Sequence, residues 1–378
     1  MSKKILIIHA TAGAGHTKAA QAIQRAFGEF ENGLEVKIIN SLDYTTPFFR
    51  LTYPKIYVFL VNRIPLVWGL FYYLLDNAFF YALVSWIRHL NNWIASQGLV
   101  KFLKEYRPDV IIATHFLAPD VISMMGKDKL KARLITVVTD YRLHSFWLAK
   151  GVDDYIVAYD ETKRDLIKRG VAADKIHILG NPIDSVFSEK LDKEEIRKRF
   201  HLDGRRFTVL VGCGGYGIGP VEKLIAAING TNVPLELLVV CGKNEELYSK
   251  VQNLAKSMNF YLVNFGFVDN MHELMEVSDL LVTKPGGIVC AEALAKGLPI
   301  IGIFPIPGQE RRNLDTLVRR GAAARLRNTD DIRNIIEKFY RHKDSLQRMK
   351  ERIASIKRPQ AALDIAKLAA ELVKKSSA

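Results

Sequence analysis

The first candidate chemical group is a histidine that follows a glycine-rich turn. Gly13, Gly15 and His16 come directly after the short apolar run KILIIHA, so the turn joins a predicted strand to a predicted helix. Two glycines let the backbone turn tightly there. They complete neither a dinucleotide fingerprint nor a P-loop. The positive end of a helix disfavours imidazolium, which predicts a neutral His16 that can accept a proton. The alternative is a structural histidine bonded to a loop carbonyl.

A second glycine turn, in the C-terminal half, carries the stronger signal. The apolar run DLLVT is followed by Gly286 and Gly287, and a predicted short helix begins there. The N–H groups of Gly287 and Ile288 at the start of this helix predict an anion site suited to a diphosphate. Glu292 would lie about a turn and a half into the same helix, where its carboxylate is placed to accept hydrogen bonds from ribose hydroxyls.

A rigid turn follows this helix along the chain. The sequence PIPGQE ends in Gln309 and Glu310, which present an amide beside a carboxylate. This pairing suits the hydroxyl groups of a sugar, because it offers both donors and acceptors. A purely structural turn is the alternative interpretation.

The elements that must position these groups alternate in type. Ten short apolar runs are typical of strands buried on both faces of a parallel sheet, and longer helical stretches separate them. The runs are KILIIHA, EVKIIN, DVIIAT, LITVVT, DYIVA and KIHILG, then FTVLVG, LELLVVCG, DLLVTK and PIIGIF. This alternation predicts an α/β fold with two doubly wound domains, residues 1–184 and 185–358, joined near the sequence GNPID.

Composition narrows the class of protein. The chain has 378 residues, of which 49% are hydrophobic and 25% charged, so it is globular. Three cysteines outside any CxxC pattern argue against a disulfide scaffold or a cysteine-rich zinc site. The short apolar run at the N-terminus leads directly into a glycine turn, which is typical of a first strand and not of a signal peptide. A cytoplasmic location is therefore expected. The net charge of +14 favours a polyanionic partner. No nucleic-acid module is visible, so an anionic membrane is the favoured partner and nucleic acid is not expected.

Residues 44–93 break the alternating pattern, because they hold 15 of the 37 aromatic residues. Between Arg63 and Arg88 the only charged residue is Asp76. The segment could span a bilayer or form buried core helices. The favoured interpretation is a surface that enters the membrane interface, since aromatic side chains prefer that depth. The predicted contacts are aromatic (Trp68, Phe71 and Tyr72) with flanking basic residues at the lipid headgroups (Arg50, Lys55, Arg63 and Arg88).

Five motifs in this order resemble family 28 glycosyltransferases. They are GAGHTKAA, TDYRLHSFW, GNPI, KPGG…EALAKGLPII and PIPGQE. The processive diacylglycerol glucosyltransferases of bacteria and the monogalactosyldiacylglycerol synthases look most similar. The resemblance covers nearly the whole chain. It implies a GT-B fold, in which two Rossmann-like domains face each other across a cleft. The N-terminal domain would bind the acceptor, the C-terminal domain the UDP-sugar, and a helix in residues 359–378 would cross back to the N-terminal domain.

The resemblance also implies a role for individual residues. His16 is the candidate catalytic base, with Gly13 and Gly15 beside it in the acceptor domain. The donor residues would divide by the part of the UDP-sugar that they hold: the diphosphate (Gly214, Gly215, Gly286, Gly287 and Ile288), the uracil (Phe267 and Val268), the ribose (Glu292) and the hexose (Gln309 and Glu310). Asp140, His144 and Trp147 match a motif near the cleft, and the sequence does not fix their roles.

The residues and the resemblance predict the same reaction. The chain has no Asp-x-Asp sequence, so no metal clamp on the diphosphate and no cofactor are expected. One base without a carboxylate nucleophile suits a single displacement with inversion at the anomeric carbon. The expected enzyme is peripheral, on the cytoplasmic face of the cell membrane. It would transfer glucose or galactose from a UDP-hexose to diacylglycerol or glycosyl-diacylglycerol, in one or more rounds. A polyprenyl acceptor, or a non-catalytic UDP-sugar sensor, are the alternatives.

Overall fold

The chain folds into two compact units. The computed structural model describes residues 3–11, 13–30, 33–126, 129–212, 214 and 219–375. Unit 1 comprises Met1–Ser185, Ile306–Arg312 and Arg358–Ala378, whereas unit 2 comprises Val186–Pro305 and Asn313–Lys357. The chain therefore leaves unit 1 near residue 185, beside the predicted boundary, and its last segment returns to unit 1.

Unit 1 is built on a six-stranded parallel sheet with the strand order β2-β1-β3-β4-β5-β6. Its strands are β1 (Lys4–His9), β2 (Glu35–Asn40), β3 (Val110–Ala113), β4 (Arg133–Val137), β5 (Asp154–Val157) and β6 (Ile176–Ile178). Its helices are α1 (Ala14–Phe27), α2 (Pro47–Arg63), α3 (Pro65–Asp76), α4 (Ala78–Ala95), α5 (Gln97–Tyr106), α6 (Leu117–Met125), α7 (Asp160–Lys168) and α16 (Ala361–Lys375).

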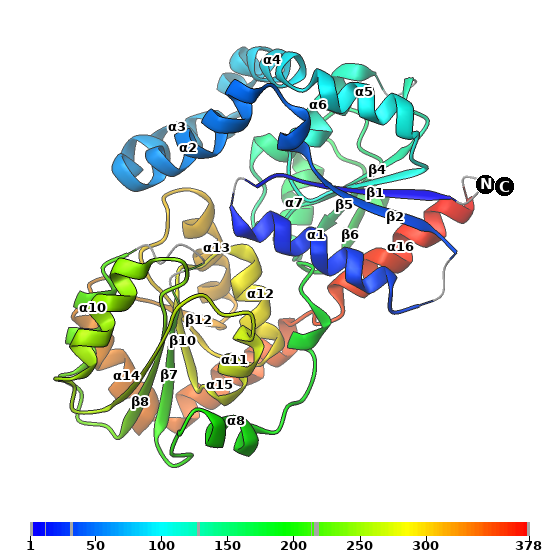
Figure 1. Cartoon of the computed structure of the whole chain (residues 1–378). Coiled ribbons are helices and arrows are strands. Elements are labelled where there is room, and N and C mark those ends of the chain that lie inside the picture. Colours follow the sequence, from blue (N-terminus) through cyan, green and yellow to red (C-terminus); the bar gives the residue numbers. More distant parts are fainter. Residues whose placement is uncertain are drawn as a thin grey trace. The chain divides into compact units, whose positions relative to one another are not determined.

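Helices cover both faces of the unit 1 sheet. Successive side chains of a strand point to opposite faces. Accordingly, Ile5 and Ile7 of β1 pack in the cluster formed by α1 and α16, whereas Leu6 and Ile8 pack with α5 and α6. Helices α1 and α16 lie side by side although they come from opposite ends of the chain (Figure 1).

Unit 2 contains a second six-stranded parallel sheet, with the order β12-β11-β10-β7-β8-β9. Its strands are β7 (Phe207–Gly212), β8 (Leu235–Val240), β9 (Tyr261–Phe265), β10 (Leu280–Thr283), β11 (Ile300–Gly302) and β12 (Ala323–Arg325). Its helices are α8 (Lys193–Arg199), α9 (Val221–Ile228), α10 (Glu245–Ala255), α11 (Met271–Val277), α12 (Gly287–Ala295), α14 (Asp331–Arg341) and α15 (Lys343–Ile356). Helix α13 (Gln309–Arg319) begins in the unit 1 segment Ile306–Arg312 and continues in unit 2.

The predicted α/β class with two doubly wound parallel sheets is confirmed. All ten apolar runs contain strands. Two strands were missed, β9 and β12, and both lie at an edge of the unit 2 sheet. In each unit the chain leaves the first strand toward one side of the sheet and later continues on its other side. β1 therefore lies between β2 and β3, and β7 lies between β8 and β10. Ligands of open parallel sheets bind at the carboxyl ends of the strands beside such switch points.

Candidate active site

His16 lies at the switch point of unit 1. It belongs to the first turn of α1, which follows β1, and its Nδ1 is 2.7 Å from the carbonyl oxygen of Thr114 at the end of β3. A carbonyl oxygen only accepts, so Nδ1 must carry the hydrogen and donate it. The Thr139 hydroxyl oxygen is 3.4 Å from the same nitrogen. The second ring nitrogen, Nε2, therefore holds the lone pair that can accept a proton.

The His16 imidazole is neutral at physiological pH. Desolvation by burial lowers its pKa to about 4, and the hydrogen bond to Thr114 opposes this shift. The ring of His115 stands edge-on to that of His16, with the centroids 4.7 Å apart, and burial also lowers the pKa of His115. The sequence predicted a neutral His16 from its place at a helix start, whereas in the structure the leading cause is burial.

The segment TDYRLHSFW supplies two further neighbours. The Trp147 side chain is only 2% exposed, and its ring centroid lies 6.1 Å from that of His16. Its indole N–H donates to Oδ2 of Asp140 at 3.3 Å. The structure thus places Trp147 beside His16 and joins Asp140 to Trp147 through the indole N–H. Gly13, with φ of 137°, forms the N-cap of α1, and Gly15 lies in its first turn.

The candidate diphosphate residues lie at the switch point of unit 2. The Thr283 hydroxyl at the end of β10 donates to the carbonyl oxygen of Gly212 at the end of β7, at 2.6 Å, and so ties the two strand ends together. Gly214, directly beyond β7, has φ of 73°, a conformation that favours glycine. Gly215 lies outside the residues that the structure describes.

Helix α12 begins where the sequence predicted. Gly286 is its N-cap, and Gly287 and Ile288 are its first helical residues, whose N–H groups point along the helix axis at its positive end. Glu292 lies in the same helix and is 4% exposed. The Nδ2 of Asn313 donates to the carbonyl oxygen of Pro285 at 3.3 Å, which braces the loop in front of α12. Sequence reasoning missed Asn313, although it follows the PIPGQE motif closely.

The candidate uracil residues follow β9. The Phe267 ring is 63% exposed, and the Lys243 ammonium, beyond the end of β8, lies 5.4 Å from its centroid. Val268 is partly buried beside it. Since parallel strands end at one edge of their sheet, these residues share that edge with Gly214 and Gly286.

Comparison with known proteins agrees with this arrangement. Residues 16–183 match the family of monogalactosyldiacylglycerol (MGDG) synthase, and residues 208–369 match the glycosyltransferase family 28 C-terminal domain. The chain belongs to glycosyltransferase family 28. It is similar to the processive diacylglycerol β-glucosyltransferases of Bacillus cereus strain B4264 and of Bacillus cytotoxicus, with 31% identity to each. The matched regions cover 95% and 96% of this chain and 91% and 92% of those relatives.

Solved structures share the fold at lower identity. MurG of Acinetobacter baumannii has a TM-score of 0.67 and 13% identity, with 98% of this chain and all of that chain covered. MnaA of S. aureus, solved with UDP, has a TM-score of 0.64 and 15% identity, with 96% and 94% covered. The GT-B fold and a UDP-sugar-dependent glycosyltransferase, both predicted from the motifs, are confirmed.

The candidate hexose residues of this family 28 protein lie in unit 1. The Gln309 amide donates to the Tyr57 hydroxyl at 2.7 Å, and Glu310 accepts from the N–H of Ile306 at 2.8 Å. Burial, with the nearby Glu310 and Asp140 carboxylates, raises the pKa of Tyr57 above its usual value. The sequence assigned this motif to the C-terminal domain, whereas its contacts place Ile306–Arg312 with unit 1.

His144 has a structural role that the sequence left open. Its Nδ1 accepts from the N–H of Phe146 at 3.1 Å, and its Nε2 donates to the carbonyl oxygen of Tyr72 at 2.9 Å. Burial lowers its pKa to about 4, although the Asp76 carboxylate opposes the shift. His144 therefore joins α3 to the turn Ser145–Trp147 as a neutral side chain.

Tyr72, one of the predicted membrane aromatics, faces inward, which corrects its assignment. Tyr72 is only 4% exposed and packs against His144, with ring centroids 4.1 Å apart and the rings tilted by 38°. Trp68 is partly buried, and its indole nitrogen is shielded from solvent. Phe71, in contrast, is 52% exposed. Arg88 also turns inward, where it forms an ion pair with the fully buried Asp120 at 2.6 Å.

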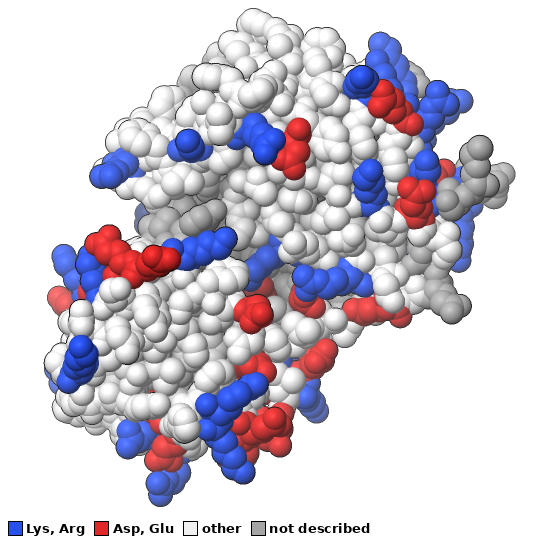
Figure 2. All heavy atoms as spheres, viewed as in Figure 1, with Lys and Arg blue, Asp and Glu red and all other residues white. Residues whose placement is uncertain are grey.

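The surface of α2, α3 and α4 is nevertheless the most apolar of the described chain. All but six of the exposed large hydrophobic side chains among the described residues belong to residues 48–94, with Leu66 at 83%, Phe48 at 77% and Leu70 at 68%. Figure 2 shows few charged residues over these helices. Among the described helices, none alone has the length and hydropathy to cross a bilayer; α2 and α3 pass only as a pair bent by 113°.

Proposed function

We propose that this protein transfers glucose from UDP-glucose to the hydroxyl group of diacylglycerol and forms a β-glucosyl lipid. Its relatives with 31% identity over nearly the whole chain are diacylglycerol β-glucosyltransferases. Structural neighbours were solved with UDP or with UDP-glucose. The observation that carries the proposal is His16, whose Nδ1 is held by Thr114 and whose Nε2 is the lone-pair acceptor.

The reaction is a single in-line displacement. His16 Nε2 accepts the proton of the lipid hydroxyl while the oxygen of that hydroxyl forms a bond to the anomeric carbon of the hexose. The bond from that carbon to the diphosphate breaks on the opposite side, and UDP leaves with the electron pair. The anomeric configuration therefore inverts. A low pKa of His16 keeps the imidazole in its accepting form.

The donor would bind at the carboxyl edge of the unit 2 sheet. The first-turn N–H groups of α12 at Gly287 and Ile288, with the glycine turn at Gly214, would stabilise the negative charge of the leaving diphosphate. Glu292 would accept hydrogen bonds from the ribose, and Phe267 with Val268 would contact the uracil. Gln309 and Glu310 would receive the hexose, which requires Gln309 to exchange its bond to Tyr57 for one to the sugar.

We further propose that transfer needs no metal ion. The chain has no Asp-x-Asp sequence to clamp a metal ion on the diphosphate. Helix-end dipoles and backbone N–H groups would supply the electrostatic stabilisation instead. Activity should therefore persist in EDTA, and loss of activity on chelation with recovery on added Mg²⁺ would contradict this proposal.

The acceptor would be reached at a membrane surface. The exposed apolar side chains of α2, α3 and α4 support a peripheral protein that dips these helices into the interface, on the cytoplasmic face of the cell membrane. Exposed basic residues such as Lys55 and Arg63 would meet anionic headgroups.

Product analysis tests the proposal. The purified protein would be incubated with vesicles that contain diacylglycerol and either UDP-glucose or UDP-galactose. The product lipids would be identified by mass spectrometry and their anomeric configuration by NMR. We expect β-glucosyl-diacylglycerol. A product formed only with UDP-galactose would reassign the donor, and no lipid product with either donor would contradict the proposal.

A further inference from the structure

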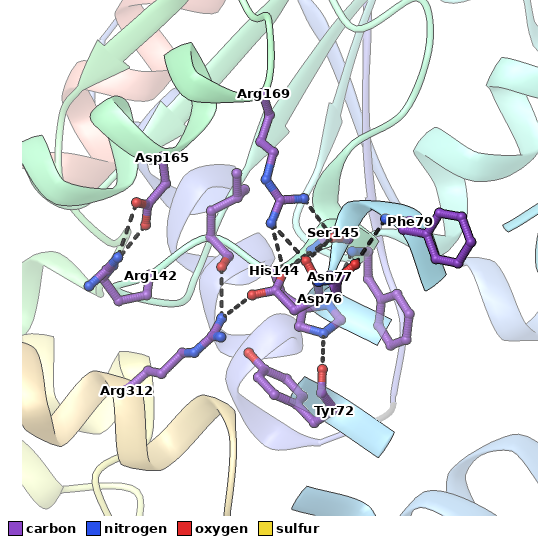
Figure 3. A network of polar contacts seen from close by, with 12 residues as sticks. Tyr72, Asp76, Asn77, Phe79, Arg142, His144, Ser145, Asp165, Arg169 and Arg312 are labelled. Atoms are coloured by element: carbon purple, nitrogen blue, oxygen red, sulfur yellow. Dashed lines mark hydrogen bonds and ion pairs between the residues drawn. The ribbon is translucent and has the colours of Figure 1, made fainter. Parts of the chain in front are cut away.

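A polar network in unit 1 joins the end of α3 to three distant segments of the chain (Figure 3). Asp76 is the last residue of α3. Its Oδ2 lies 2.6 Å from Nη1 of Arg312, and its Oδ1 accepts from the Ser145 N–H at 2.9 Å. Arg169 approaches the same carboxylate at 3.3 Å and donates to the Asp76 carbonyl oxygen at 2.8 Å. Burial alone would raise the pKa of Asp76, but the charge and hydrogen bond of Arg312 and the hydrogen bond from the Ser145 N–H lower it overall, so the carboxylate stays charged.

Arg312 is fixed on several sides. Besides the ion pair with Asp76, its guanidinium donates to the carbonyl oxygen of Leu143 at 3.1 Å. It also lies over two aromatic rings of α3, at 5.2 Å from the centroid of Tyr72 and 5.1 Å from that of Tyr73. A planar guanidinium held by hydrogen bonds and lying close to aromatic rings is not replaceable by lysine without loss of geometry.

The segment that carries Arg312 packs tightly against α3. A Cβ atom at Gly69 would lie 2.7 Å from Cβ of Pro307. A Cβ atom at Gly308, whose φ is +100°, would lie 2.6 Å from the ring of Tyr72. Both distances are shorter than real Cβ contacts, so these two glycines permit the approach. Together with the bond from Gln309 to Tyr57, the segment Ile306–Arg312 is held along α2 and α3.

We infer that the Asp76–Arg312 ion pair is a positioning contact, which fixes the backbone of Gln309 and Glu310 where their side chains can turn to the hexose of the donor. Arg312 acts through these two side chains and does not itself touch the sugar. The inference rests on the proposed function, in which Gln309 and Glu310 receive the hexose. It also makes α3 a shared element, because the same helix exposes Leu66, Leu70 and Phe71 on the apolar surface.

The test compares UDP with UDP-glucose in matched variants. Arg312→Gln removes both the positive charge and the planar guanidinium, whereas Arg312→Lys keeps the charge. Asp76→Asn removes the negative charge of the ion pair. Arg142→Gln is the control, because Arg142 forms a bidentate pair of 2.7 and 3.0 Å with Asp165 on α7, close to the network but outside it (Figure 3). Calorimetry would give the affinity for UDP, and initial rates on diacylglycerol vesicles the KM for UDP-glucose.

We expect Arg312→Gln and Asp76→Asn to raise the KM for UDP-glucose by ~10-fold or more, the effect of losing one charge-assisted hydrogen bond, with UDP affinity unchanged within about twofold. Arg312→Lys should recover part of the loss, and the control should match the parent. The double variant should be no worse than the poorer single variant, since both changes break one contact.

Two results would overturn the inference. One is unchanged kinetics in Arg312→Gln and in Asp76→Asn. The other is a loss of affinity that is equal for UDP and UDP-glucose and equal in Arg312→Lys and Arg312→Gln. Such a result would indicate that the substitutions disrupt the fold rather than the hexose site. A Gln309→Ala variant separates this failure from that of the proposed function. If Gln309→Ala does not selectively weaken use of UDP-glucose, the proposed hexose site fails. If it does and Arg312→Gln does not, only the positioning role of Arg312 fails.

Discussion

The apolar surface of α3 gives the most quantitative prediction. We expect the triple change Leu66→Ser, Leu70→Ser and Phe71→Ser to release the protein from vesicles. These side chains are 83%, 68% and 52% exposed, so their replacement removes little packing from the folded protein. Full burial of one such side chain is worth about 1.5–3 kcal/mol. Partial burial at an interface would give ~1 kcal/mol each, so the triple change should weaken partitioning by ~100-fold.

Vesicle co-sedimentation measures this effect. Binding of the parent should rise with the fraction of anionic lipid and fall in 1 M salt, where the Debye length is ~3 Å. Ile167→Ser is the matched control, because Ile167 is 43% exposed on α7, outside residues 44–93. UDP binding should be unchanged in all variants. If the triple variant pellets as the parent does, on neutral and anionic vesicles alike, the apolar surface is not the lipid contact.

Three further predictions concern named side chains. Because the neutral His16 is the active form and its pKa is about 4, kcat/KM should stay flat from pH 8 to about 5.5 and fall only toward pH 4; half-loss near pH 6.5 would contradict this. Glu292→Gln should weaken UDP binding by ~1–3 kcal/mol in calorimetry, whereas Gln309→Ala should spare UDP; equal losses would refute the division of roles. His144 is also neutral in the folded protein, where its pKa is about 4, against 6.5 in the unfolded chain. Between these two pH values the unfolded state binds more protons than the folded state, so the contribution of His144 to the free energy of unfolding is lost as the pH falls. In urea unfolding, the free energy of unfolding should fall between pH 7 and pH 5 by about 2 kcal/mol more in the parent than in His144→Gln. An equal fall in both proteins would contradict this prediction.

All eight inner strands and the edge strands β2 and β6 were predictable from their apolar runs, whereas the edge strands β9 and β12 were not. A strand with neighbours on both sides and helices on both faces is apolar throughout, as in FTVLVG of β7, whose six residues are all buried. The missed strands are short or polar at one end: β12 has only the three residues AAR, and Asn264 interrupts the apolar residues of YLVNF in β9.

The helix starts at the candidate site were predictable, because they depend on local sequence. The glycine turns at Gly13 and Gly286 mark the starts of α1 and α12, and a helix start is a local feature. The tautomer of His16 depends on Thr114, which is 98 residues away along the chain, so sequence spacing does not reveal it. Tyr72 was wrongly assigned to the membrane surface for the same reason. Its neighbours in the sequence are also aromatic, and its contact with His144, 72 residues away, is not visible in the sequence.

The role of His16 is the central claim, and a single-turnover experiment tests it most directly. Enzyme in excess over UDP-glucose, on diacylglycerol vesicles, would report the rate of glucosyl transfer for the parent and for His16→Ala. Loss of a general base should slow this step by ~10²–10⁴-fold. UDP affinity, measured by calorimetry on the same samples, should not change, because the base does not hold the donor. A His16→Ala rate within a factor of a few of the parent would show that another group accepts the proton.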